Sequence, residues 1–129
     1  MEKDITTLDD VKIVVDTFYA KIQKDDLLKD IFNNVIRDNW HEHLEKMYRF
    51  WQTVLLKEHT YYGSPFPPHA KLPVDAEHFQ RWIKLFYETL DELFAGERTE
   101  EAKWRAEKMA QMFQYKIEYY RNNPENQIL

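Results

Sequence analysis

One histidine lies in a stretch that prolines stiffen, and its side chain is the first candidate for chemistry. The stretch runs from Tyr62 to Pro73, has prolines at positions 65, 67, 68 and 73, and places His69 directly after two of them. Proline fixes its own φ angle and pushes the preceding residue out of the helical region, so His69 has few backbone alternatives. Neutral imidazole is the commonest metal ligand among side chains, which favours a ligand to a metal or a cofactor. The pattern alone leaves a second interpretation open, a surface histidine beside the start of a helix.

Three other side chains could face a pocket, although each also has a plainer interpretation. Tyr19 lies on the apolar face of the first predicted helix, where a core tyrosine is the alternative. Phe32 stands between two short elements, either as core or as a ring that faces a pocket. His43 shares a helix face with Met47, four residues further on, and is either a boundary histidine or a functional one. His41 points in another direction from His43, so the two do not chelate one metal.

Helices position all of these side chains. Apolar residues recur at helical spacing through most of the chain, and strand-like alternation is absent. Thr7 followed by acidic residues predicts the first helix start, and Gly96 is expected to stop the fourth helix. The pattern predicts a first helix from after Thr7 to about residue 22 and a short one over 27–32, which the turn pair Asn33-Asn34 ends. It predicts longer helices over about 40–57, from Asp75 to about 94, and from Thr99 to Asn122. Either Met112 or Phe113 belongs to the inner face of the last helix.

Composition limits the class of protein. The 129 residues fit one all-α domain over 1–129, with a frayed tail from about 122. A net charge of −5 without a basic stripe argues against a nucleic-acid partner. Zero cysteines exclude disulfides and thiolate sites, and the absence of an apolar run of membrane length or a signal peptide favours a cytoplasmic protein. Aromatic residues make up 16% of the chain, enough to line the pocket of a flat apolar ligand or to pack one another.

Six landmarks in order resemble a known family, the truncated (2-on-2) haemoglobins, and their spacing is similar to its group III, found in bacteria. The resemblance covers about residues 11 to 113 and implies a globin-like, two-over-two helical sandwich around a haem pocket. The landmarks are Phe18-Tyr19, Ile31-Phe32-Asn33-Asn34, Trp40-x-x-His43, Phe50-Trp51, Tyr62-Gly63-x-Pro65 with His69, and Trp82-x-x-x-Phe86.

The resemblance also implies a role for individual residues. His69 would be the metal ligand, bound to the iron of haem b. On the opposite, distal side, Tyr19 and Trp82 would donate hydrogen bonds to a small ligand, with His43 at the pocket mouth. The residues expected to contact the cofactor are His69, Phe32, Met47, Phe50, Tyr62, Lys71, Leu72, Phe79 and Trp82. The side chains considered for the haem propionates are Lys71, Arg81, Tyr61 and Tyr62.

Three functions follow as hypotheses. The first is a haem protein that binds oxygen and other small diatomic ligands (nitric oxide, carbon monoxide, cyanide), as in oxygen transport. The second is a haem enzyme, with peroxidase-like or nitric oxide dioxygenase activity, that takes electrons from an external reductase. The third is a cofactor-free helical interaction module in which the aromatic residues are core and His69 is a loop residue. Two distal donors favour retention or activation of oxygen over quick delivery, because each can slow dissociation by roughly 10- to 100-fold.

Overall fold

The structure is a computed structural model that describes residues 3–63 and 72–123. The described part of the chain is all-helical and has no strand, which confirms the predicted fold class. Its helices are α1 (Leu8–Ile22), α2 (Lys29–Ile36), α3 (Trp40–Leu56), α4 (Ala76–Leu93) and α5 (Glu97–Asn122).

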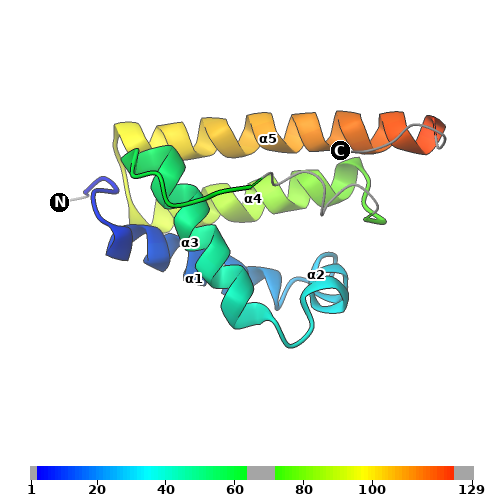
Figure 1. Cartoon of the computed structure of the whole chain (residues 1–129), viewed down its shortest axis with the longest axis horizontal. Helices are drawn as coiled ribbons and strands as arrows, with labels where there is room; N and C mark the ends of the chain where they lie inside the picture. The colour runs from blue at the N-terminus through cyan, green and yellow to red at the C-terminus, as the bar shows by residue number, and fades with distance from the viewer. Residues whose placement is uncertain (1–2, 64–71, 124–129) are drawn as a thin grey trace.

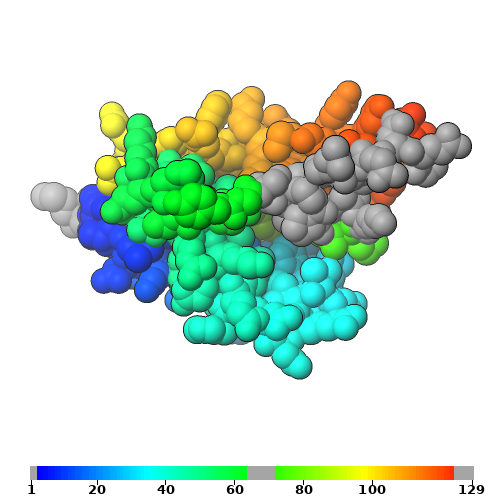
Figure 2. All heavy atoms as spheres, in the orientation of Figure 1, coloured from blue at the N-terminus to red at the C-terminus, as the bar shows by residue number. Residues whose placement is uncertain are grey.

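The helices form two layers of two. The short connection after α4 turns the chain back, so α4 and α5 lie side by side and run in opposite directions (Figure 1). The pair α1 and α3 packs across them, with α1 against α4 and α3 against α5. Figure 2 shows the same layers at the surface, with α5 (orange) along one edge and α2 and α3 (cyan to green) on the opposite side. This arrangement leaves the short α2 beside the space between the layers.

The start of α1 follows the predicted pattern. The Thr7 hydroxyl accepts a hydrogen bond from the Asp10 backbone N–H at 3.2 Å, and the Asp10 carboxylate accepts one from the Thr7 N–H at 3.2 Å. This reciprocal capping box satisfies N–H groups that have no partner within the helix. The residues that recur at helical spacing are all buried: Val11, Val14, Val15, Phe18 and Ile22.

The predicted end of α2 is wrong. Asn33 and Asn34 lie inside the helix, which ends at Ile36, and Arg37 turns the chain with a φ of 54°. The Asn33 carbonyl accepts the Arg37 N–H at 2.9 Å, and the Asn33 side chain accepts the Trp40 indole N–H at 3.2 Å. The asparagine therefore joins α2 to α3 instead of forming a turn of its own.

The predicted start of α5 is also wrong, for a reason far away in the chain. The helix begins at Glu97, and Gly96, expected to stop α4, occupies its N-cap. The Asp4 carboxylate supplies the cap, because it accepts the Arg98 N–H at 2.8 Å and both the N–H and the hydroxyl of Thr99, at 2.9 and 2.8 Å. Burial alone would raise the pKa of Asp4, but these hydrogen bonds lower it below its ordinary value. Thr99 is thus a buried residue of the first turn.

Position 96 requires glycine because of the neighbouring Asp4 side chain as well as because of its own backbone conformation. Its φ is +141°, and a Cβ built there would lie 2.6 Å from the Asp4 Cγ. We expect Gly96→Ala to lower the free energy of unfolding by about 2–4 kcal/mol, since it adds a clash with the α5 cap to backbone strain. Urea unfolding monitored by circular dichroism measures the change.

Gly63→Ala is the matched control for that substitution. Gly63 has a similar φ of +146°, but a Cβ there meets Tyr61 only at an ordinary contact distance of 3.6 Å. The control therefore carries backbone strain without the clash. Equal losses in the two variants would contradict a special role for the contact between Gly96 and Asp4.

Candidate functional site

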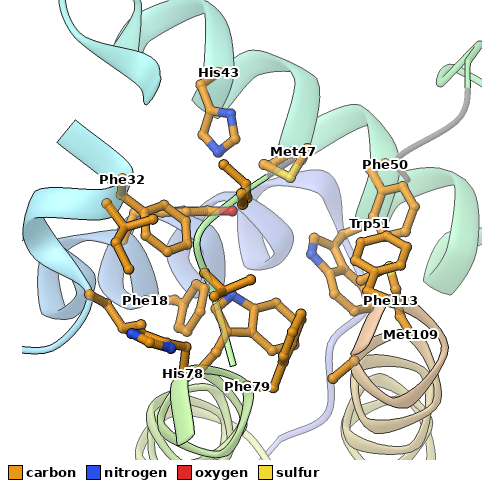
Figure 3. Close-up of a pocket in the computed structure, with 17 residues that line it drawn as sticks. Phe18, Phe32, His43, Met47, Phe50, Trp51, His78, Phe79, Met109 and Phe113 are labelled. Carbon is orange, nitrogen blue, oxygen red and sulfur yellow. The ribbon is translucent and has the colours of Figure 1, made fainter. Parts of the chain in front are cut away.

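A large apolar cavity lies between the two layers. About 930 Å³ of empty space lies among its walls, open solvent at its mouth included. All five helices contribute to its walls, as does the segment before α4 (Figure 3). The lining residues are Phe18, Tyr19, Leu28, Ile31, Phe32, His43, Met47, Phe50, Trp51, Leu72, Val74, His78, Phe79, Trp82, Met109, Ala110 and Phe113. Protein interiors are close-packed, so an apolar space between two helical layers favours an occupant.

Polar groups meet on the α1 and α3 side of this cavity. The rings of Tyr19 and His43 lie 5.0 Å apart between centroids, and Trp40 contacts both, at 5.8 Å from Tyr19 and 5.9 Å from His43. Tyr19 is only 7% exposed, and burial raises its pKa, so the phenol keeps its O–H at physiological pH. The Nε2 atom of His43 is also buried. This side of the cavity therefore offers an O–H donor beside an imidazole.

Stacked aromatic rings hold Trp82 in place. Its indole lies almost parallel to Phe86, with centroids 5.6 Å apart, and Trp51 stacks on Phe86 at 5.1 Å. Phe18 meets Trp82 edge-on at 5.5 Å. Large rings packed in these geometries stabilise one another and leave little rotational freedom. The indole of Trp82 is thus a fixed part of the wall.

His78 lies across the cavity from His43 (Figure 3). Its Nδ1 accepts the backbone N–H of Asp75 at 2.9 Å, which helps to cap the start of α4. Because Nδ1 is an acceptor, the neutral ring carries its proton on Nε2. The cavity therefore has an imidazole on each of two opposite walls.

Comparisons with known proteins agree with this architecture. The family model for bacterial-like globins matches residues 4–116. The group 3 truncated haemoglobin of Campylobacter jejuni is 37% identical over 111 residues, which cover 83% of this chain and 87% of that protein. The crystal structure of the group III truncated haemoglobin from Campylobacter jejuni superposes with a TM-score of 0.81 at 34% identity and covers 91% of this chain and 95% of that one. The chain belongs to the group III truncated haemoglobins.

Family membership makes haem the implied occupant of this globin's cavity, and small diatomic molecules its implied ligands. The cavity fits such a cofactor, because its walls are almost wholly apolar and aromatic and hold only a few fixed polar groups. Among the described residues, no helix is long and apolar enough to cross a membrane.

This globin brings most of the predicted site residues together. Those that line the cavity are Tyr19, Phe32, His43, Met47, Phe50, Leu72, Phe79 and Trp82. His69 and Lys71 lie outside the described residues, so the metal ligand and one candidate for the propionates stay predictions.

The remaining candidates for the propionates lie elsewhere. Tyr62 is 79% exposed and donates its hydroxyl to the His59 carbonyl at 3.3 Å, and it is not among the lining residues. Tyr61 packs edge-on against Phe50 at 5.3 Å, next to the cavity wall. The Arg81 guanidinium of α4 lies 2.6 Å from the carboxylate of Asp25, in the connection between α1 and α2. This ion pair joins that connection to α4. An arginine engaged in this way is less available to a carboxylate of the cofactor.

Nine lining residues were not predicted as site residues. They are Phe18, Leu28, Ile31, Trp51, Val74, His78, Met109, Ala110 and Phe113. Phe113 is 5% exposed and Met112 is 44% exposed, which decides between the two for the inner face of α5. The helical period identifies the inner face of a helix, but a residue that touches a cavity has the same period as one that touches packed core. His78 could have been selected from the sequence, because it is an imidazole one turn after a predicted helix cap.

Proposed function

We propose that this globin binds haem b in the cavity, with His69 as the protein ligand to iron, and that it binds oxygen and other small diatomic molecules there. The observation that carries the proposal is the placement of Tyr19 and His43 together on one wall of an apolar cavity that Trp82 also lines. When bound, haem would supply an iron atom that can bind a small ligand.

Apolar side chains would hold the cofactor. Phe32, Phe79 and Phe50 offer ring faces, and Met47 and Leu72 offer aliphatic contacts to a flat macrocycle. Lys71 is proposed as a cation for the propionates. Tyr62 is a weaker candidate because its hydroxyl is already used by His59.

The distal side chains would select and retain the ligand. Tyr19 is a neutral phenol in a buried place, so its O–H is suited to donate to a ligand that carries partial negative charge. The Trp82 indole N–H is a second donor of the same kind, since indole nitrogen only donates. His43, in contact with Tyr19, would stand where the ligand passes.

An absorption spectrum of the haem-supplied protein tests the proposal. We expect a Soret band that shifts on reduction and again with carbon monoxide. His69→Gly should lose the wild-type spectrum and regain a similar one with added imidazole, because free imidazole replaces the missing ligand. His59→Gly, a change at another loop histidine, should leave the spectrum unchanged.

Two outcomes would contradict the proposal. No Soret band after haem loading would favour the helical interaction module. A wild-type spectrum in His69→Gly would remove His69 as the ligand.

One observation favours an enzyme as the second candidate. The imidazole of His43 lies against Tyr19, and an imidazole next to a bound ligand can take or give a proton. Peroxidase-like or nitric oxide dioxygenase turnover would need an external reductase as electron donor. Turnover with peroxide or nitric oxide no faster than that of free haem would reject this candidate.

A further inference from the structure

Large apolar side chains lie exposed along the outer face of α5. Figure 1 shows this helix along one edge of the molecule, with the other helices on its inner side. In the described part of the chain seven large hydrophobic residues are exposed, and four of them belong to α5. They are Trp104 (54% exposed), Met112 (44%), Tyr115 (71%) and Tyr119 (44%). Aromatic residues and methionine are enriched in protein interfaces, so their concentration on one helix points to a partner.

The spacing of the exposed residues places them on one continuous face. Positions 104, 108, 111, 115 and 118 are separated by alternate steps of four and three residues, the interval at which one helix packs along another. All five are exposed, and Met112 and Tyr119 flank them on one side. The face from Trp104 to Tyr119 is about 22 Å long. It points away from the core, which α5 meets with Ala102, Ala106, Ala110, Phe113 and Ile117.

The two ends of this face complement each other. A second copy of α5 in antiparallel orientation, related by a two-fold axis between residues 111 and 112, places each residue opposite its counterpart at the other end. Three pairs of side chains then meet: Trp104 with Tyr119, Lys108 with Tyr115, and Arg105 with Glu118. The first pair joins two aromatic rings, the second a cation and a ring, and the third two opposite charges. Each of these combinations is attractive.

A parallel pair of α5 helices lacks this complementarity. It would place Lys108 opposite Lys108 and Arg105 opposite Arg105, and like charges repel. It would also align the two helix dipoles, whereas an antiparallel pair brings the partly positive N-terminus of each helix beside the partly negative C-terminus of the other. The residues of the face therefore favour a second copy of this chain in antiparallel orientation.

The charged side chains of the face can exchange their present contacts for contacts with a second copy. Arg105 pairs with Glu101 at 3.3 Å and lies over the ring of Trp104. Glu118 accepts a hydrogen bond from the Gln114 amide at 3.4 Å. These are exposed contacts within one helix, and such contacts contribute little to stability.

The face ends before Arg121, which is held within its own chain. Its guanidinium donates to three groups outside α5, the Asp75 carboxylate at 2.8 Å and the carbonyls of Leu72 and Val74 at 3.0 and 2.7 Å. An arginine with three such acceptors gains less from a further partner. The pairing therefore involves only the residues up to Tyr119.

We propose that the outer face of α5, from Trp104 to Tyr119, is the interface through which two copies of this chain form an antiparallel, two-fold symmetric dimer. Each contact occurs twice, because a two-fold interface uses the same surface of both subunits. Trp104 is the main anchor, since tryptophan is among the residues that contribute most to binding at interfaces. The proposal does not depend on haem, because the cavity is lined by the inner side of α5.

Sedimentation equilibrium of the full chain, from micromolar to millimolar concentration, measures the association. We expect an equilibrium between monomer and dimer. Trp104→Ala should weaken the dimer by roughly 30-fold or more, the effect of losing an interface anchor. Ile13→Ala, which truncates another exposed apolar side chain on α1, is the control and should leave the equilibrium unchanged. The mass of a monomer at every concentration would overturn the proposal, and so would wild-type association in Trp104→Ala.

Charge reversal tests the antiparallel pairing. Arg105→Glu and Glu118→Arg each create two pairs of like charges across the interface, so each variant should dimerise roughly 10- to 100-fold more weakly. An equimolar mixture of the two variants should recover wild-type association, because each chain then meets the opposite charge in the other. Positions 105 and 118 are about 20 Å apart along α5, so this recovery cannot arise within one chain.

The mixture also separates a lost interface from a damaged fold. Two misfolded variants would not restore each other, and circular dichroism of each should show the helix content of the wild type. Arg49→Glu, a charge reversal at an exposed arginine of α3, is the matched control and should leave association unchanged. A mixture that associates as weakly as the single variants would overturn the antiparallel dimer.

Discussion

Ala110→Phe is expected to weaken haem binding by roughly 10- to 100-fold while the helical fold persists. Ala110 is 6% exposed and lines the cavity from α5, so a phenyl ring at this position occupies space that the cofactor needs. In the haem-free protein the same ring fills an empty apolar space, and we expect the melting temperature to stay the same or rise. Titration of the apoprotein with haem and thermal unfolding of the apoprotein measure the two effects.

Ala106→Phe is the matched control, one turn earlier on the same helix. Ala106 is fully buried but does not line the cavity, so a phenyl ring there must displace packed neighbours. Overpacking of this kind costs about 1–3 kcal/mol, and both the apoprotein and the haem-loaded protein should lose stability. Stability of the apoprotein should thus stay the same or rise in Ala110→Phe and fall in Ala106→Phe, and this difference distinguishes a cavity from packed core. If Ala110→Phe bound haem as wild type does, haem would not occupy this cavity.

In Tyr19→Phe, oxygen should dissociate from the reduced, haem-loaded protein roughly 10- to 100-fold faster, because a hydrogen bond to a charged group contributes about 1.5–3 kcal/mol. The ring itself should keep its place, since it packs edge-on against Phe18 at 5.0 Å and Phe32 at 6.1 Å. The substitution therefore removes the donor and little else. Stopped-flow displacement of oxygen by carbon monoxide measures the rate.

Tyr48→Phe is the control for the loss of a phenol. Tyr48 lies near the surface and donates its hydroxyl to Asp16. Partial burial and that carboxylate raise the pKa of Tyr48 to about 12. Its removal should leave oxygen dissociation unchanged. A Tyr19→Phe variant with the wild-type rate would assign retention to Trp82 alone, and Trp82→Phe would then have to carry the full effect.

Local sequence signals predicted the parts of the fold that local interactions determine. The start of α1 depends on Thr7 and Asp10, three residues apart, and the burial of Phe18 follows from the helical period. The sequence alone left Phe32 open as core or as a ring facing a pocket, whereas Phe79 came from the family resemblance. The structure places both at the cavity.

The sequence-based predictions failed where contacts between residues far apart in the chain determine the structure. Thr99 has the sequence features of a cap, but its hydroxyl is taken by Asp4, 95 positions earlier. Asn33 has the features of a turn, but its side chain serves Trp40 of the next helix. Arg121 has no signal in the sequence, because its partners Leu72, Val74 and Asp75 lie 46 to 49 positions away. Periodicity carries no information about such pairs.

The cap that Asp4 places on α5 has a consequence for the order of folding during synthesis. Domains fold as the chain leaves the ribosome from its N-terminus, and α1 can form early because its own cap is local. The carboxylate of Asp4 has to wait for Arg98 and Thr99, which are made after four of the five described helices. We therefore expect the N-terminal segment to dock late, so that Asp4→Ala speeds unfolding and hardly changes the folding rate. The segment made just before α1 is then among the last to find its place.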